Sequence, residues 1–380
     1  MKPTLLIIVN DLKFFLSHRL NIALTAKKSG YKVYIGYGVS DRISILSLKK
    51  INLEFFYVPI KRGGFNPWNE IKSLYYIWRL IKKIKPSVVH LITLKPCLYG
   101  GIINYFSKVK GVLFAFPGMG ILFSSNKWFY KIIRIFLYLF FWCIFKKKNY
   151  LVLFQNTSDR DMFIKFRLCE KNKTRLIKGC GVDLATFKKY KEPKGAVHVM
   201  FISRLLYDKG ISFFISAAKL IKARCALPIK FWIVGSQDSG NPNSVSKQEL
   251  DKWRQEGIVE IKGYINNMKN IYKKSHIVCL PSFYGEGLPN VIVEAAATGR
   301  PVVTTDHPGC REAIIDGITG ILVPIKNSEK LANAIEYLAT KKKIRTLMGN
   351  KARVFAEKEF SLKKVSEKHV ELYNQLLNFH

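Results

Sequence analysis

Acidic residues are scarce in this chain. Its 380 residues include 26 Asp and Glu against 63 Lys and Arg, which gives a formal net charge of +37. So large an excess favours association with anionic partners, whether nucleic acid, phospholipid head groups or substrates that carry phosphate. Charge alone does not choose among these partners, and base composition accounts for part of the excess, because the chain is rich in Lys, Ile, Asn, Phe and Tyr together.

Paired cysteines are absent. The seven cysteines are odd in number, widely scattered and form no C-x-x-C pair, so neither a disulfide framework nor a zinc site is predicted. They are Cys97, Cys143, Cys169, Cys180, Cys225, Cys279 and Cys310. This pattern favours a reducing compartment.

Long hydrophobic runs are missing as well. The first apolar run, Thr4–Val9, is too short for a signal peptide and suits a buried strand, which favours a cytoplasmic protein. The most apolar segment, Trp128–Phe145, is interrupted by Lys131 and Arg134. Its uncharged part is about half of the roughly 20 residues that a spanning helix needs.

Three interpretations of the segment Trp128–Phe145 stay open. Its basic residues, its tryptophans and the following Lys146–Lys148 favour a helix lying in the cytoplasmic membrane surface. The alternatives are a helix buried in a protein core and a true membrane span.

Strand-like apolar runs alternate with helical patterns along the chain. In the first half, strands are expected at Leu5–Val9, Val33–Tyr37, Leu53–Pro59, Ser87–Ile92, Val112–Phe116, Leu151–Phe154 and Arg175–Ile177. Helices are expected at His18–Ser29, Trp68–Ile84, Cys97–Ser107 and from Trp128. After the polar segment Lys188–Gly195 the alternation restarts with Val197–Ser203, Ile211–Ala223, Ile229–Gly235, Glu260–Tyr264, His276–Ser282 and Pro301–Thr305.

This alternation predicts an α/β protein made of two doubly wound, Rossmann-like domains with parallel sheets. The expected bounds are 1–187 and 196–362, with a last helix over 363–380 that packs back on the first domain. A ligand would bind in a central cleft between two such domains, outside the carboxyl ends of the strands.

The glycine-rich stretch Gly285–Glu294 is the most informative motif. It places Glu286 in a loop and Glu294 in the helix that follows, after a predicted buried strand. Pro289 suits the first helical turn, where backbone N–H groups are free to receive an anion such as a diphosphate. The alternative is an ordinary strand, loop and helix with two surface glutamates.

Two cations, Arg204 and Lys209, stand in another expected strand-to-helix loop, just before Gly210. Preorganised cations there would stabilise the negative charge that grows on a departing diphosphate. Two solvated basic side chains in a basic chain are the competing interpretation.

Together with the turn Lys262–Ile265, these segments resemble the family 4 retaining glycosyltransferases of GT-B fold. The resemblance covers the second domain and includes Gly179–Asp183, Gly309–Glu312 and Gly320–Pro324. It implies that Arg204 and Lys209 bind the donor diphosphate and that Glu294 binds the ribose hydroxyls. The nucleobase would meet the backbone near Ile265, with Gly263 and Tyr264, and the donor sugar would meet Glu286, Gly287 and Leu288. The remaining contacts expected for the nucleotide sugar are Pro289 and Asn290.

The first domain matches this family less closely, since no glycine-rich turn follows the first strand. Val88–Pro96 is similar to the His-bearing strand end of the subgroup that builds bacterial surface glycans on lipid carriers. The resemblance implies that His90 contacts the donor sugar or the reacting centre; a structural histidine is the alternative. The candidate acceptor contacts are His18, Arg19, Thr93, Lys95, Gly118 and Asn156.

No metal or cofactor is expected beyond the nucleotide-sugar substrate. Asp159-Arg160-Asp161 superficially matches the metal-binding Asp-x-Asp of the other major glycosyltransferase fold, but it follows Asn156 as an acidic cluster at a helix start, which predicts capping. Arg204 and Lys209 would supply the positive charge that a metal otherwise gives.

The resemblance implies a retaining enzyme, peripheral on the inner face of the cytoplasmic membrane. It would transfer a hexose or N-acetylhexosamine from a nucleotide sugar, expected to be UDP-linked, to a polyprenyl-diphosphate-linked oligosaccharide in bacterial surface polysaccharide (O-antigen, lipopolysaccharide) synthesis. Attack on the same face of the sugar is favoured over a covalent intermediate. The alternatives are a sugar-nucleotide hydrolase or epimerase on this fold and a basic nucleic-acid-binding protein, for which no recognition motif is present.

Overall fold

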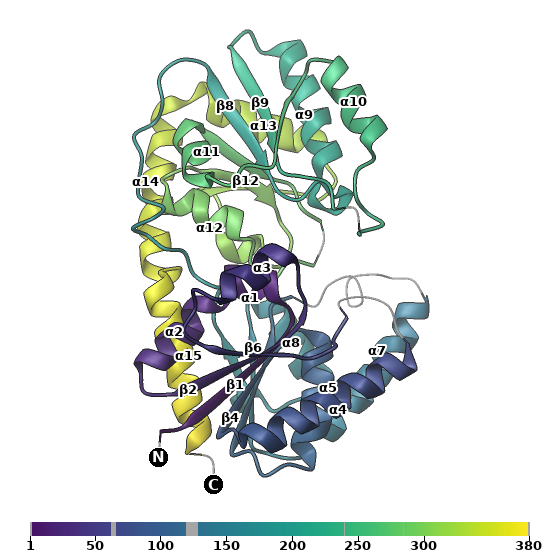
Figure 1. Ribbon diagram of the computed structural model, residues 1–380. Helices are drawn as coiled ribbons and strands as arrows, with labels where there is room; N and C mark the ends of the chain where they lie inside the picture. The colour runs from purple at the N-terminus through teal and green to yellow at the C-terminus, as the bar shows by residue number, and fades with distance from the viewer. Residues whose placement is uncertain (1, 62–65, 119–127, 239, 284, 379–380) are drawn as a thin grey trace. The chain divides into compact units, whose positions relative to one another are not determined.

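The computed structural model (Figure 1) describes residues 2–61, 66–118, 128–238, 240–283 and 285–378. It divides into two compact units: the first unit combines Met1–Cys180 with Leu362–His380, and the second unit is Gly181–Ser361. The first unit thus ends at Cys180 rather than at residue 187, and the segment Lys188–Gly195, expected to be a linker, lies within the second unit.

The first unit contains a seven-stranded parallel sheet in the order β3-β2-β1-β4-β5-β6-β7. Its strands are β1 (Thr4–Asp11), β2 (Lys32–Val39), β3 (Glu54–Tyr57), β4 (Val88–Ile92), β5 (Gly111–Phe116), β6 (Tyr150–Phe154) and β7 (Thr174–Leu176). Its helices are α1 (Leu12–His18), α2 (Leu20–Lys28), α3 (Arg42–Leu48), α4 (Pro67–Ile84), α5 (Leu94–Tyr105), α7 (Trp128–Ile144), α8 (Thr157–Lys165), the 3-10 turn η1 (Lys171–Lys173) and α15 (Leu362–Leu377).

Strand β1 shows how this sheet builds a core on each face. Its residues Leu5–Val9 are apolar without interruption and buried, as in a strand covered on both sides. Leu6 and Ile8 join the cluster that includes residues of α4, α5 and α7, whereas Leu5, Ile7 and Val9 join the cluster that includes residues of α2 and α15. Alternate side chains therefore pack against opposite layers of helices.

The last helix, α15, belongs to the first unit and packs against α2 and β5. Tyr373 and Leu376 are fully buried there, and Tyr31 donates a hydrogen bond to Asn374 (2.6 Å). A Cβ at Gly111 would lie 2.5 Å from the Cβ of Leu376, so the close approach of helix and strand requires glycine. The expectation that this helix returns to the first domain is thereby confirmed.

The second unit contains a six-stranded parallel sheet in the order β10-β9-β8-β11-β12-β13. Its strands are β8 (Val197–Ile202), β9 (Ile229–Val234), β10 (Glu260–Gly263), β11 (Ile277–Leu280), β12 (Val302–Thr305) and β13 (Gly320–Val323). Its helices are η2 (Tyr207–Lys209), α9 (Ile211–Arg224), α10 (Lys247–Gln255), α11 (Met268–Lys274), α12 (Asn290–Ala297), η3 (Arg311–Ala313), α13 (Ser328–Thr340) and α14 (Lys342–Glu359). The expected fold of two Rossmann-like domains is confirmed.

Each sheet has one point where the strand order reverses direction. In the first unit it lies between β1 and β4, and in the second unit between β8 and β11. Ligands of open parallel sheets bind outside the carboxyl ends of the strands at such points. In the second unit these are the loops that carry Arg204, Lys209 and Glu286.

The helix α7 leaves most of its apolar surface uncovered. Phe141 and Ile144 are buried, but Trp128, Phe129, Ile132, Ile135, Phe136, Leu139 and Trp142 are each between 44% and 72% exposed. The alternative that this segment is a wholly buried core helix is therefore wrong. Among the helices of the described ranges, none is long and apolar enough to cross a membrane.

Candidate active site

The loops after β8 and β11 bring together two of the residues singled out in the sequence. Lys209, at the end of η2, forms an ion pair with Glu286, and both side chains are largely buried, at 13% and 14% exposure. Ser282 also donates a hydrogen bond to the same carboxylate (3.0 Å). A cation and a carboxylate 77 positions apart in the sequence thus meet at the reversal point of the second sheet.

Glycines allow these loops to pack closely. Gly210 has φ +79°, and a Cβ there would lie 2.1 Å from the carbonyl oxygen of Pro281. Gly309 has φ +87°, and its Cβ would lie 2.5 Å from the carbonyl oxygens of Glu286 and Gly287. A side chain at either position would push the loop that carries Glu286 away from its neighbours.

Arg204 lies in the same group of loops and is more exposed. Its Nη1 donates to Asp238 Oδ2 at 2.6 Å, with the two side chains 45% and 30% exposed. Asp238 follows β9, and the nearby Gly235 N–H binds the carbonyl of Gly263 (2.9 Å), which joins the end of β9 to the end of β10. An exposed pair of this kind is weak and readily exchanged for a stronger anion.

Glu294 lies on α12 beneath these loops. Tyr272 of α11 donates a hydrogen bond to its carboxylate (2.8 Å). Burial raises the pKa of Glu294 to about 7, although the hydrogen bond from Tyr272 opposes the shift. Burial likewise raises the pKa of the Tyr272 hydroxyl, so it stays a donor. The carboxyl group therefore changes its charge near neutral pH.

The other expected donor contacts lie in two loops. Tyr264 is 66% exposed after β10, whereas Ile265 packs against the core of the second unit. Leu288 is also part of that core, so only its backbone is available to a ligand. Pro289 is the N-cap of α12 rather than a residue of its first turn, and Asn290 begins the helix.

The sequence suggested that His90 lies at a strand end, but the structure places it inside a strand. It is the third of the five residues of β4, fully buried, and its Nδ1 lies 2.9 Å from the hydroxyl of Tyr373 on α15. Burial, with His369 and Arg19 nearby, holds the pKa of His90 well below its usual range. The histidine is thus neutral and packed between the sheet and the last helix.

Arg19 is a buried cation at only 2% exposure. With the Gln155 amide oriented to match its neighbours, Gln155 accepts from Arg19 Nη2 (3.0 Å) and donates to the carbonyl of Pro117 (3.1 Å). No described residue accepts a hydrogen bond from Arg19 Nε or Nη1, and the Nε2 atoms of His90 and His369 are also unpaired and buried. At 2% exposure, the Arg19 side chain is not open to solvent.

The remaining acceptor candidates divide into exposed and engaged groups. His18, stacked on Phe14, is partly exposed, and burial with the Arg19 charge lowers its pKa to about 4. Lys95 forms an ion pair with Glu70 of α4 (2.6 Å). Thr93, just before α5, adopts φ +75°, a strained value for a β-branched residue, and its buried hydroxyl has no partner among the described residues.

Gly118 and Asn156 follow β5 and β6. Gly118 is partly buried at the end of a described segment. Asn156 is the buried N-cap of α8: it accepts from the N–H of Asp159 (2.7 Å) and donates to the Asp159 carboxylate (2.9 Å). The Asp159-Arg160-Asp161 cluster therefore lies at a helix start, as expected. Within the described ranges, no three His, Cys, Asp or Glu side chains are grouped to hold a metal ion.

Sequence reasoning missed Asp238, Ser282 and Tyr272, which contact Arg204, Glu286 and Glu294. Asp238 follows one predicted strand and Ser282 ends another, so position alone could have suggested them. Tyr272 carries no such signal because it lies inside a helix that the sequence did not predict.

The two parallel-sheet units define a GT-B fold, and solved structures share it. A glycosyltransferase from Rickettsia africae ESF-5 superposes with a TM-score of 0.80 at 20% identity, covering 100% of both chains. HepE from Anabaena, solved in complex with UDP and glucose, superposes with a TM-score of 0.75 at 17% identity, covering 97% of this chain and 99% of the other.

Sequence comparisons identify the family. Residues 5–147 match the model of the glycosyl transferase 4-like domain, and residues 196–341 match that of the glycosyl transferases group 1. The chain is a glycosyltransferase and belongs to family 4 of the GT-B fold, as its motifs suggested.

Two curated relatives are similar over most of their length. One is the N,N'-diacetylbacillosaminyl-diphospho-undecaprenol alpha-1,3-N-acetylgalactosaminyltransferase of Campylobacter jejuni, 24% identical over 89% of both chains. The other is the UDP-Gal:alpha-D-GlcNAc-diphosphoundecaprenol alpha-1,3-galactosyltransferase of Escherichia coli, 26% identical over 84% of this chain and 83% of the relative.

Proposed function

We propose that this glycosyltransferase moves a hexose or N-acetylhexosamine, with retention, from a UDP-sugar to a polyprenyl-diphosphate-linked oligosaccharide in bacterial surface polysaccharide synthesis. The observation that carries the proposal is the ion pair of Lys209 and Glu286 at the reversal point of the second sheet. The acceptor class is inferred from the named activities of the two curated relatives.

In the proposed donor site, each charged side chain has a single role. The diphosphate would take over the cations of Lys209 and Arg204 from their partners Glu286 and Asp238. Glu286, released from Lys209, would accept hydrogen bonds from hydroxyls of the donor sugar, and Glu294 from the vicinal ribose hydroxyls. The base would meet the backbone of Gly263–Ile265.

The proposed acceptor site lies at the carboxyl ends of the first sheet. Thr93 and Lys95 stand at the start of α5, beside the reversal point between β1 and β4, and His18 ends the helix that follows β1. Arg19 and His90 are both buried, so in this proposal they hold neighbouring groups in place and do not contact the acceptor. We assign His90 to holding α15 against β4 rather than to the reacting centre.

Nucleotide release from UDP-, GDP- and ADP-sugars, with and without a polyprenyl-diphosphate-linked disaccharide, tests this function. We expect UDP release that needs the acceptor and is lost in Glu294→Ala and Arg204→Ala. Arg254→Ala is the matched control, since Arg254 also forms an exposed pair, with Asp251 (2.6 Å). Release without acceptor would favour a sugar-nucleotide hydrolase, and release from none of the sugars would contradict the proposal.

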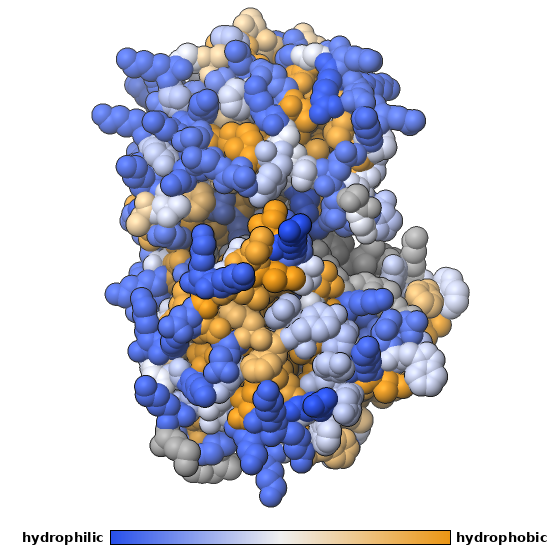
Figure 2. All heavy atoms as spheres, in the orientation of Figure 1, coloured by the Kyte–Doolittle hydropathy of each residue, from blue (hydrophilic) through white to orange (hydrophobic). Residues whose placement is uncertain are grey.

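The first unit has a surface suited to the membrane that holds such an acceptor. Figure 2 shows orange apolar side chains open to solvent over α4 and α7, between blue and pale ones. On α4, Trp68, Ile71, Tyr75 and Trp78 are exposed, as are seven large apolar side chains of α7. Lys146, beside Trp142, supplies positive charge. Exposed aromatic and basic side chains together fit an anionic lipid surface on the cytoplasmic face.

Replacing Phe136 and Leu139 of α7 by serine is expected to weaken binding to anionic vesicles by at least about tenfold, because burying one such side chain is worth about 1.5–3 kcal/mol. Flotation with phosphatidylglycerol vesicles measures the bound fraction. Ile43→Ser with Leu46→Ser on α3 is the control, since these side chains are equally open. Equal loss in both double variants would contradict a docking role for α7.

A further inference from the structure

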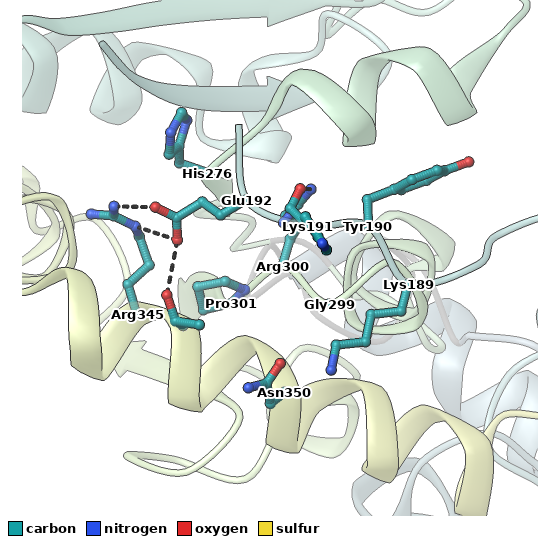
Figure 3. A pocket seen from close by; sticks show the side chains of 11 residues that line it. Lys189, Tyr190, Lys191, Glu192, His276, Gly299, Arg300, Pro301, Arg345 and Asn350 are labelled. Carbon is teal, nitrogen blue, oxygen red and sulfur yellow. Dashed lines mark hydrogen bonds and ion pairs between the residues drawn. The ribbon is translucent and has the colours of Figure 1, made fainter. Parts of the chain in front are cut away.

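A cavity lies in the second unit, away from the loops of the candidate active site. It has a volume of about 430 Å³ and is lined by residues 189–192, His276, Gly299, Arg300, Pro301, Arg345, Thr346 and Asn350. His276 directly precedes β11, and Pro301 directly precedes β12. The cavity (Figure 3) therefore lies at the amino ends of the strands. Glu286 and Lys209 belong to loops at their carboxyl ends.

The floor of the cavity is closely packed. Gly349 of α14 lies so near the turn before β12 that a Cβ there would be 2.3 Å from the carbonyl oxygen of Gly299. Gly299 itself has φ +76°. A Cβ added there would lie 3.2 Å from Cγ of Lys189, so the aliphatic part of the Lys189 side chain packs over this glycine. Figure 3 shows the Lys189 side chain reaching toward α14, where Asn350 lies. The backbone that forms this floor is fixed.

Two arginines fix the walls. Arg300, buried, donates to the carbonyls of Tyr272 (3.0 Å) and Lys191 (3.0 Å). Arg345 donates to both oxygens of Glu192 (3.2 and 2.5 Å) and to the carbonyls at the end of α13. Thr346 binds the same carboxylate (3.2 Å). Glu192 is thus fully engaged with Arg345, and the segment 189–192 is held against the unit.

The charge of this cavity is unbalanced. Lys189, Lys191, Arg300 and Arg345 line it with a single carboxylate, Glu192. His276 adds no charge at neutral pH, because burial lowers its pKa to about 4 and its ring contacts His198 N and Pro193 O. Among the described residues, none forms a hydrogen bond or ion pair with the ammonium groups of Lys189 and Lys191.

We propose that this cavity binds a small molecule through a phosphate or diphosphate group held by Lys189 and Lys191. Two ammonium groups over a preformed floor provide donors to several phosphate oxygens, and the buried charge of Arg300 adds to their field. The volume falls in the range of small-molecule sites. Binding here does not depend on the function proposed above.

The residues that line the cavity lie close in the sequence to the two segments that connect the units. The chain passes between the two units twice, after Cys180 and after Ser361. These two passages run side by side, since Val182 N donates to the carbonyl of Phe360 (2.8 Å). Lys189 and Lys191 follow the first passage, and α14 precedes the second. A phosphate bound there would lie beside these two segments, which the pair of Glu192 and Arg345 already joins.

Titration calorimetry with inorganic pyrophosphate at physiological salt tests the site. We expect two classes of site in the wild type: one lost in Arg204→Ala with Lys209→Ala, the other weakened by about tenfold per lysine in Lys189→Ala with Lys191→Ala, because hydrogen bonds to charged groups are worth about 1.5–3 kcal/mol. Lys188→Ala with Lys194→Ala is the matched control, since both lysines belong to the same segment outside the cavity.

The outcomes distinguish binding of pyrophosphate in this cavity from nonspecific attraction to a basic surface. Retention of both classes in the control variant supports the cavity. Equal loss in the two lysine pairs, or a single class that disappears with Arg204 and Lys209, overturns the proposal, as does an absence of heat in the wild type.

Discussion

Glu286→Ala is expected to lower turnover by about 100-fold or more without any glycosyl-enzyme accumulating, since a preorganised group that acts on the transition state is typically worth that much. In our proposal the bond from the anomeric carbon to the diphosphate oxygen breaks while the acceptor oxygen bonds to the same face. The acceptor proton passes to the departing diphosphate oxygen. Glu286 holds the sugar hydroxyls in place and forms no bond to the sugar.

The ion pair of Glu286 with Lys209 means that this prediction needs a control for stability. In the free enzyme its ammonium is held by Glu286 in a largely buried pair, so removing the carboxylate leaves an unpaired cation. Glu286→Gln keeps the shape and isolates the charge, and unfolding midpoints of all variants separate lost stability from lost catalysis. Intact mass of the wild type incubated with donor alone decides the mechanism: a covalent sugar adduct would contradict same-face attack.

The fold could be predicted because nearly every strand is a short run of apolar residues between turn signals. The runs at Leu5–Val9 and Val112–Phe116 match β1 and β5 to within two residues at each end. The helix expected at His18–Ser29 was wrong in its start. Asp11, at the end of β1, accepts from Phe14 N (3.0 Å) and starts α1 at once, and the chain breaks at Arg19 before α2.

The sequence singled out individual residues of the candidate site but not their pairings. Loop position made Lys209 and Glu286 candidate ligand contacts, yet nothing in the sequence shows that the two side chains pair with each other in the free protein. His90 shows a second limit of the sequence. Its expected place at a strand end was wrong, because it lies inside β4 with its ring against Tyr373 of α15, a helix more than 270 positions away.

Glu294→Gln is expected to weaken donor binding by about 10- to 100-fold at pH 8, since the hydrogen bonds from ribose hydroxyls to a charged acceptor are worth about 1.5–3 kcal/mol. Because the pKa of Glu294 is raised to about 7, wild-type affinity for UDP should increase as pH rises from 6 to 8 and then level off. The variant should lack this contribution of Glu294 to the pH dependence. Calorimetry with UDP at each pH measures both.

The same substitution should stabilise the unliganded protein. The folded state holds the Glu294 proton up to about pH 7, whereas the unfolded chain releases it near 4.5, so stability falls as pH rises between these values, by about 3 kcal/mol in all. Glu294→Gln removes this loss. Glu249→Gln is the opposite control, because Glu249 also accepts from a tyrosine, Tyr207, but that hydrogen bond lowers its pKa. That variant should lose stability at neutral pH with no change in UDP binding, and a gain of stability in both would mean that burial of Glu294 does not set its charge.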